Sequence, residues 1–213
     1  MSLNVDAWNK PDRGALFIVT GASGTGKTTL VKRALSTISN IQFSVSATTR
    51  AKRDGETDGK DYHFLERSEF ERLKENEALL EWAQVYKNFY GTLREPVLKA
   101  LRSGESILLE IDQQGASQVK AQMPEAISIF ILPPTMASLE KRLRNRNTDS
   151  DEIIARRLRE AQDQIDHCGS FDYLVINDDL ESASDQFMSI LIAELLKRNR
   201  RDSWVQKFVP NKR

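Results

Sequence analysis

The stretch Gly21-Ala22-Ser23-Gly24-Thr25-Gly26-Lys27-Thr28 fits the phosphate-binding loop pattern G-x-x-x-x-G-K-[ST] at every fixed position. It follows an apolar run at residues 15–20, which predicts a buried strand, and precedes apolar residues at helical spacing over 29–38. Glycines let such a loop turn its N–H groups toward a polyphosphate without Cβ clashes, and the following helix adds the positive end of its dipole. The stretch therefore predicts a strand, loop and helix that bind a nucleoside triphosphate.

The residues of this loop divide the expected work. We expect Lys27 to reach the outer phosphates and the Thr28 hydroxyl to hold Mg²⁺. The alternative is a glycine-rich turn that carries a lysine by chance, and the strand and helix on either side disfavour it. The candidate triphosphate contacts are Gly21, Ala22, Ser23, Gly24, Thr25, Gly26, Lys27, Thr28 and Thr29.

Apolar runs alternate with helical patterns along the rest of the chain. Such alternation implies an α/β fold of three layers, a parallel sheet with helices on both faces. Ser68 followed by Glu71 also predicts a capping box at the start of one helix. Further strands are predicted at residues 43–47, 107–111, 127–132 and 173–176, and helices at 68–77, 95–102, 115–123, 136–144, 151–167 and 180–198.

The chain divides into a core and several smaller parts. Residues 50–92 open in a polar, glycine-punctuated run and predict a small α+β insertion. Residues 142–150 are predicted to be an exposed stretch, because they are rich in Arg, Asn and Asp. A basic C-terminal segment is expected to be a solvated tail, although folding back or a subunit contact stays open. The predicted parts are the tail 1–13, the core 14–49 and 93–198, the insertion 50–92, and the tail 199–213.

Composition excludes several classes of partner. The formal net charge is zero, so no global attraction to nucleic acid or to a membrane follows, and any anion site must be a local cluster of arginine and lysine. Cys168 is the one cysteine, which argues against a disulfide framework, and no apolar run approaches the ~18 residues of a membrane span. We therefore expect a cytoplasmic protein that acts on small molecules, as a monomer or a homo-oligomer.

A second set of anion-binding side chains lies in and beside the insertion. Arg50 and Arg53 are planar donors suited to bidentate phosphate recognition, and Tyr62 and Tyr90 add neutral hydroxyl donors. Four donors converging on one site suit the dianion of a nucleoside monophosphate. The alternative is two solvated arginines and two core tyrosines.

Several short motifs in this region resemble those of the guanylate kinases. The resemblance runs from about residue 14 to residue 198, and the motifs follow one another at matching spacing. It implies a P-loop NTPase fold and the Mg²⁺-dependent transfer of the γ-phosphate of ATP to GMP, and with it dGMP, giving ADP and GDP. The motifs are Thr48-Thr49-Arg50, Arg53 with Gly55-Glu56, Gly59 with Asp61-Tyr62, Glu81-Trp82, and Tyr90-Gly91-Thr92.

The resemblance also implies how the acceptor is held. The two arginines and two tyrosines would hold the phosphate of GMP. Glu81 would accept the N1–H and the 2-amino group of guanine, whereas adenine presents a lone pair at N1 and no 2-amino group. Ser46 and Thr92 would donate to the guanine O6, and Asp112 would face the 2-amino edge. The candidate GMP contacts are Ser46, Arg50, Arg53, Tyr62, Glu81, Tyr90, Thr92 and Asp112.

The resemblance places further groups around the transferring phosphate and the metal. It implies that a helical lid at about residues 142–156 closes over ATP. Arg142 and Arg146 share a helix face at spacing i, i+4, and Arg157 lies on the next helix, across this lid. Asn177 matches a position that helps hold the adenine of ATP. Glu110 or Asp112, at a strand end, would order the water shell of Mg²⁺, and the choice between them is open. The candidate catalytic residues are Lys27, Arg53, Arg142, Arg146 and Arg157, and the metal candidates are Thr28 and, through water, Glu110.

No general base is required, because the attacking group is a phosphate oxygen that is already mostly ionised at pH 7. Two rival functions remain. A protein-interaction scaffold that has lost catalysis would typically lack the intact phosphate loop. A kinase for another phosphorylated acceptor, such as a ribosyl bisphosphate, would need no group that reads guanine.

Overall fold

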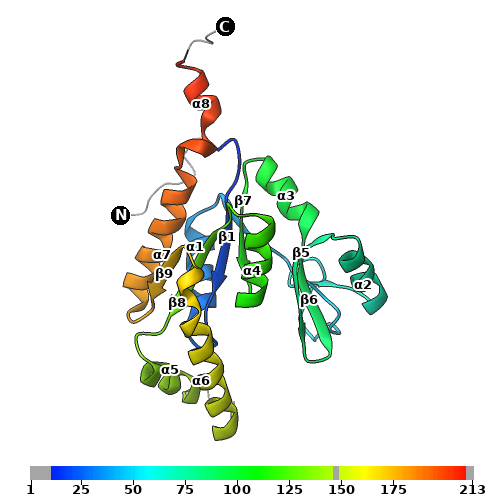
Figure 1. Ribbon diagram of the computed structural model, residues 1–213, viewed down its shortest axis with the longest axis vertical. Coiled ribbons are helices and arrows are strands. Elements are labelled where there is room, and N and C mark those ends of the chain that lie inside the picture. Colours follow the sequence, from blue (N-terminus) through cyan, green and yellow to red (C-terminus); the bar gives the residue numbers. More distant parts are fainter. Residues whose placement is uncertain (1–10, 146–148, 210–213) are drawn as a thin grey trace.

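The computed structural model describes residues 11–145 and 149–209 and is built on a five-stranded parallel sheet (Figure 1). Its strand order is β2-β7-β1-β8-β9, so the strand that leads into the phosphate loop lies at the centre. This sheet confirms the predicted α/β class. The strands are β1 (Leu16–Thr20), β2 (Ile41–Phe43), β7 (Ser106–Glu110), β8 (Ile127–Leu132) and β9 (Tyr173–Ile176).

Helices cover both faces of this sheet. Side chains alternate between the faces of a strand, and β1 follows that rule. Phe17 and Val19 pack in the core beneath α1 (Lys27–Thr37) and α7 (Leu180–Leu195). Leu16 and Ile18 pack in a second core beneath α3 (Arg94–Arg102) and α4 (Gln113–Gln122). The three predicted layers are therefore present, with β1 buried along its whole length.

A second, four-stranded sheet forms the smaller unit beside α3 and α4 (Figure 1). Its order is β4-β3-β6-β5, and β5 and β6 form an antiparallel pair. Helix α2 (Arg67–Glu75) packs Phe70 against this sheet, where its ring stacks on Phe89 with centroids 5.4 Å apart. The unit thus has a hydrophobic core of its own. Its strands are β3 (Ala47–Thr48), β4 (His63–Phe64), β5 (Leu79–Val85) and β6 (Asn88–Leu93).

Two local predictions are wrong. The strand expected at residues 43–47 is two strands in different sheets, because the chain leaves the large sheet after Phe43 and joins the small one at Ala47. The expected capping box does not form, since α2 begins earlier, with Glu66 at its N-cap and no side-chain cap. Glu71 instead accepts a hydrogen bond from Arg67 Nε at 3.0 Å.

The predicted lid, residues 142–156, takes in the end of one helix and the start of the next. They are α5 (Met136–Arg144) and α6 (Asp151–Asp166), and a short 3₁₀ helix, η2 (Cys168–Ser170), follows them. Leu139 and Leu143 of α5 pack with Ile154 and Ala161 of α6 against Ala22 of the phosphate loop. The lid helices therefore rest directly on the loop.

The C-terminal segment folds onto the core over its described part. After α7 come η3 (Arg198–Arg200) and α8 (Asp202–Gln206). Arg200 is 7% exposed, and its guanidinium donates to the carbonyl of Gly14 at 2.7 Å and to that of Glu194 at 3.1 Å. No helix within 11–145 and 149–209 is long and apolar enough to cross a membrane.

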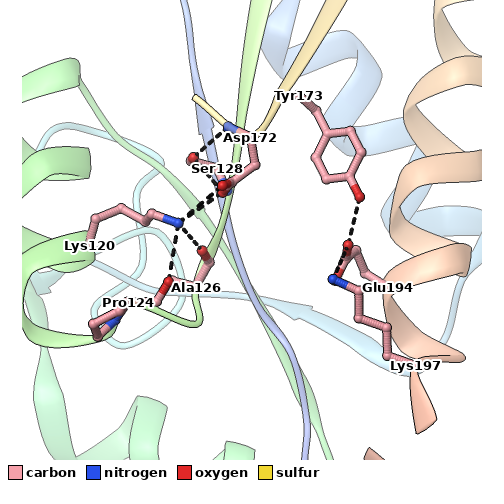
Figure 2. A network of polar contacts seen from close by, with 8 residues as sticks. All are labelled: Lys120, Pro124, Ala126, Ser128, Asp172, Tyr173, Glu194 and Lys197. Atoms are coloured by element: carbon pink, nitrogen blue, oxygen red, sulfur yellow. Dashed lines mark hydrogen bonds and ion pairs between the residues drawn. The ribbon is translucent and has the colours of Figure 1, made fainter. Parts of the chain in front are cut away.

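Two polar clusters fasten the large sheet to its helices (Figure 2). On one side, Lys120 of α4 donates to Asp172, whose carboxylate also accepts from the backbone N–H and hydroxyl of Ser128 on β8. On the other, the Tyr173 hydroxyl donates to Glu194 of α7 at 2.7 Å, and this bond together with burial raises the pKa of Tyr173 to about 12.

Candidate active site

Two glycines of the phosphate loop stand where no side chain fits. Gly21 has φ of +147°, and a Cβ there would lie 2.4 Å from the carbonyl oxygen of Ile131. Gly26, the N-cap of α1, has φ of +93°, and a Cβ there would lie 2.2 Å from Nδ2 of Asn177. Both conformation and space therefore demand glycine at the two ends of the loop.

Lys27 lies folded back over the loop. Its ammonium donates to the carbonyl of Gly21 and, at 3.1 Å, to that of Ala22. Thr25 braces the loop from within, because its buried hydroxyl donates to the same Ala22 carbonyl at 2.9 Å. The cation expected to meet the outer phosphates is therefore held at the loop and bound to backbone oxygens.

Thr28 and Glu110 meet at the mouth of the loop. The Thr28 hydroxyl donates to Glu110 Oε1 at 2.9 Å, and both residues line one pocket with the loop and the first turn of α1. Asp112, the other metal candidate, instead caps α4, where its Oδ1 accepts from Gly115 N at 2.7 Å. A hydroxyl and a carboxylate side by side are oxygen donors of the kind Mg²⁺ prefers.

Asn177 supports the loop from the end of β9. Its buried side-chain amide donates to the carbonyl of Thr25 at 2.7 Å, and its own carbonyl accepts from Arg142 at 2.8 Å. Arg142 also reaches the carbonyl of Asp178 at 3.4 Å. The residue expected to hold adenine thus joins the loop to α5.

The two described lid arginines have different protein partners. Arg142 is bound to the end of β9, whereas Arg157 on α6 pairs with Asp149 at 2.8 Å. Arg146 lies outside the described residues. In this arrangement the two described arginines have protein partners, and each must exchange them to meet a nucleotide.

The four predicted phosphate donors lie on the small unit, and they have an acidic neighbour. Arg50 pairs in bidentate fashion with Glu56, at 2.7 and 3.0 Å, and this guanidinium holds the pKa of Glu56 below its usual value. Arg50 also lies 5.3 Å from the ring centroid of Tyr62, which contacts Tyr90 edge to face. Burial raises the pKa of Tyr62, so its hydroxyl stays a neutral donor. Arg53 is exposed, and its backbone N–H donates to Glu56 at 2.8 Å.

The predicted guanine-reading groups gather where β5 and β6 pair. Glu81 is 5% exposed, faces Thr92 across the ladder, and accepts a hydrogen bond from the Thr92 hydroxyl at 2.7 Å. Burial raises the pKa of Glu81 to about 7, the Thr92 contacts oppose the rise, and the charge of Asp112 adds to it. Ser46 lies level with Thr92, since Ala47 pairs with Gly91 on the neighbouring strand. The site therefore offers a recessed carboxylate bonded to the Thr92 hydroxyl, and Ser46 precedes β3, which pairs with the opposite edge of β6.

Sequence reasoning missed three contributors. Glu56 belongs to a quoted motif, but its pairing with Arg50 is visible only in the fold. Gly115 and Gln118 lie on α4, and both contact β5 at or beside Glu81. The motif around Glu56 was a usable signal for the first, whereas nothing in the linear pattern links residues 115–118 to residue 81.

Comparison with known proteins gives one consistent result. The family profile described as guanylate kinase matches residues 13–194. A guanylate kinase of Carboxydothermus hydrogenoformans is 47% identical over 188 residues, 88% of this chain and 92% of that protein. One of Neisseria gonorrhoeae is 47% identical over 199 residues, 93% of this chain and 97% of that protein. The crystal structure of guanylate kinase from Anaplasma phagocytophilum has a TM-score of 0.68 at 38% identity, covering 89% of this chain and 90% of that one.

Proposed function

The chain belongs to the guanylate kinase family, its reaction is the transfer of the γ-phosphate of ATP to GMP, and we propose that the residues described above divide this reaction between a donor half and an acceptor half. The donor half is the loop 21–28 with Glu110, Arg142 and Asn177. The acceptor half is the small unit with its arginines, tyrosines and Glu81. A cytoplasmic location and a part in purine nucleotide metabolism go with this proposal.

In the donor half, the loop amides and Lys27 bind the phosphates of ATP. Lys27 must leave the carbonyls of Gly21 and Ala22, and a polyphosphate provides the stronger partner because it is fully charged. The paired oxygens of Thr28 and Glu110 fit Mg²⁺, with Thr28 as a ligand and Glu110 acting through a bound water. The ion would supply positive charge beside the β- and γ-phosphates.

In the acceptor half, Arg50, Arg53, Tyr62 and Tyr90 bind the phosphate of GMP. Glu81, once ionised, accepts hydrogen bonds from the N1–H and 2-amino groups of guanine, and the hydroxyls of Thr92 and Ser46 donate to O6. Asp112, the N-cap of α4, receives the 2-amino group. A buried carboxylate left facing the lone pair of adenine disfavours AMP by up to roughly 10⁴-fold.

The chemistry is positioning and charge compensation. A phosphate oxygen of GMP attacks the γ-phosphate in line. No residue has to remove a proton, because this oxygen is already mostly ionised at pH 7. One pair of like unit charges ~4 Å apart costs about 4 kcal/mol at an effective dielectric of 20, and the two nucleotides bring several. Lys27, Arg53 and the lid residues Arg142, Arg146 and Arg157 provide the opposing charge, and closure of the lid excludes water.

Recessed Glu81 beside Thr92 is the observation that carries the assignment of the acceptor, because a phosphate loop alone names no second substrate. A coupled assay of ADP release with GMP, dGMP, AMP, CMP and UMP tests it. We expect turnover with GMP and dGMP and at most traces with the others. Equal turnover with AMP would refute guanine readout, and no turnover with any nucleotide would favour an interaction scaffold.

A further inference from the structure

One face of helix α4 is fastened to the strand that carries Glu81. Strand β5 lies at the end of the small sheet, where an edge leaves backbone groups without a neighbouring strand. Gln118 takes the place of that neighbour: its Oε1 accepts from Trp82 N at 3.1 Å, and its Nε2 donates to Trp82 O at 3.0 Å. Gln122 donates to Leu80 O at 2.8 Å. The residues on both sides of Glu81 are therefore bound to α4.

Gly115 lies one turn before Gln118 on the same helix and leaves room for the Glu81 carboxylate. A Cβ at this position would lie 2.9 Å from Glu81 Oε2, 3.4 Å from Glu81 Cδ and 3.3 Å from Asp112 Oδ1. The backbone of Gly115 is ordinary helix, so no unusual φ calls for glycine there. A side chain at position 115 would instead crowd the carboxylates of Glu81 and Asp112, and that of Glu81 is the nearer.

Helix α4 is itself fixed to the large sheet. Lys120, on its last turn, donates to the carbonyls of Pro124 and Ala126 and to the carboxylate of Asp172 (Figure 2). Asp172 in turn accepts two hydrogen bonds from Ser128 on β8. Helix α4 is therefore hydrogen-bonded both to the large-sheet side and to β5, the strand that carries Glu81.

We propose that Gly115 and Gln118 are positioning residues for base selection. Gly115 sets the space into which the Glu81 carboxylate extends, and Gln118 fixes the strand on which Glu81 stands. Both residues lie on α4, outside the residues that line the pocket at the phosphate loop. This proposal rests on the proposed function, because it takes Glu81 as the group that reads guanine.

The variant Gly115→Ala tests the first residue, with Gly169→Ala as its matched control. Glu81 Oε2 is the end of a flexible side chain, so the fold can absorb the new methyl group by displacing the carboxylate. We expect KM for GMP to rise roughly tenfold, the loss of one charged hydrogen bond, with KM for ATP and kcat at saturating GMP little changed. Among residues 11–145 and 149–209, no atom lies within 4 Å of a Cβ built on Gly169, so the control should match the wild type.

A double-mutant cycle separates action through Glu81 from a general disturbance. In a Glu81→Ala background, Gly115→Ala should add no further change in KM for GMP. The kcat/KM ratio of GMP over IMP, which lacks the 2-amino group, should fall in the single variant. An unchanged KM in the single variant, an equal added effect in the Glu81→Ala background, or a loss of cooperative unfolding would overturn the role of Gly115.

The variant Gln118→Met tests the second residue, because it keeps the length of the side chain and removes both hydrogen bonds to Trp82. Ser117→Ala on the same helix is the control, since Ser117 is exposed and its hydroxyl donates to the carbonyl of Gln113 within the helix. We expect a several-fold rise in KM for GMP and none for ATP in Gln118→Met. Equal changes in both KM values, or none, would refute this part.

The wild-type assay keeps the two proposals distinct. If the wild-type chain failed to prefer GMP, the proposed function would fall before any α4 variant was measured. If the wild type prefers GMP and Glu81→Ala removes that preference, whereas Gly115→Ala and Gln118→Met behave as their controls, only the positioning role is wrong.

Discussion

The protonation of Glu81 should control GMP binding near neutral pH. Burial raises the pKa of this carboxyl to about 7, and only the ionised form can accept both N–H groups of guanine. About one carboxyl in ten is ionised at pH 6 and about nine in ten at pH 8, so the affinity for GMP should rise roughly tenfold between the two through this group.

The phosphate of GMP also titrates in this range, with a second pKa near ~6, so the comparison needs a reference protein. Glu81→Gln provides it, because it keeps the shape of the side chain and an oxygen that accepts from Thr92. Isothermal titration calorimetry with GMP, in two buffers of different ionisation enthalpy, gives both the affinity and the protons released. The difference between the two proteins isolates the Glu81 contribution.

Stability gives a second, independent measure of the same group. Burial raises the pKa of Glu81 in the folded protein above the ordinary 4.5, so the ionised carboxylate opposes folding. The stability that this group contributes is therefore complete below pH 4.5, where the carboxyl is protonated, and is lost as the pH rises through about 7. The shift corresponds to roughly 3 kcal/mol at most. Urea denaturation at pH 5 and pH 8 should therefore show a loss in the wild type that Glu81→Gln lacks. Parallel pH profiles for the two proteins, in both affinity and stability, would refute this reasoning.

Four further substitutions test other parts of the molecule. Lys27→Ala should leave the melting temperature nearly unchanged and lower kcat about a hundredfold or more in the coupled assay, because it removes a cation from the phosphates, and near-normal turnover would contradict the loop assignment. Gly26→Ala should lower the free energy of unfolding in urea by about 3 kcal/mol. The new Cβ would lie 2.2 Å from Nδ2 of Asn177, and the positive φ of this position also strains an alanine. Gly55→Ala, at φ of +86° and with open space around its Cβ, isolates the backbone strain and should lower the free energy of unfolding by about 1 kcal/mol. Equal losses in the Gly26 and Gly55 variants would show that the protein relieves the clash with Asn177. Arg200→Met should lower the free energy of unfolding by about 1–3 kcal/mol, since it leaves two carbonyls without their donor, and an unchanged urea midpoint would show that the C-terminal contact adds nothing to stability.

The elements of the large sheet could be predicted because each is a local pattern. The strand Tyr173–Ile176 and the helix Met136–Arg144 have the predicted bounds, since apolar periodicity and the flanking residues mark both. The strand expected at 43–47 could not be resolved in the same way. Its residues continue an extended pattern, and only tertiary contacts show that the chain changes sheets between Phe43 and Ala47.

The site residues divide in a similar way. The loop 21–28 is contiguous, so its motif states the geometry directly. The pairing of Glu81 with Thr92 was not predicted as a contact, but both residues were named through their motifs. Gly115 and Gln118 acquire meaning only because α4 lies along β5, and a glycine and a glutamine in a helix carry no chemical signature of their own.

The ion pair between Arg50 and Glu56 gives the acceptor site a built-in competitor. Both side chains are largely shielded from solvent, 12% and 20% exposed, so the guanidinium is already matched by a carboxylate before any ligand arrives. An incoming anion binds by exchange, and its gain is the difference between two bound anions rather than the full attraction of a bare cation. In its proposed role Arg50 attracts a dianion more strongly than a monoanion, so a dianion competes better with the Glu56 carboxylate. We therefore expect this exchange to favour phosphate monoesters over singly charged metabolites.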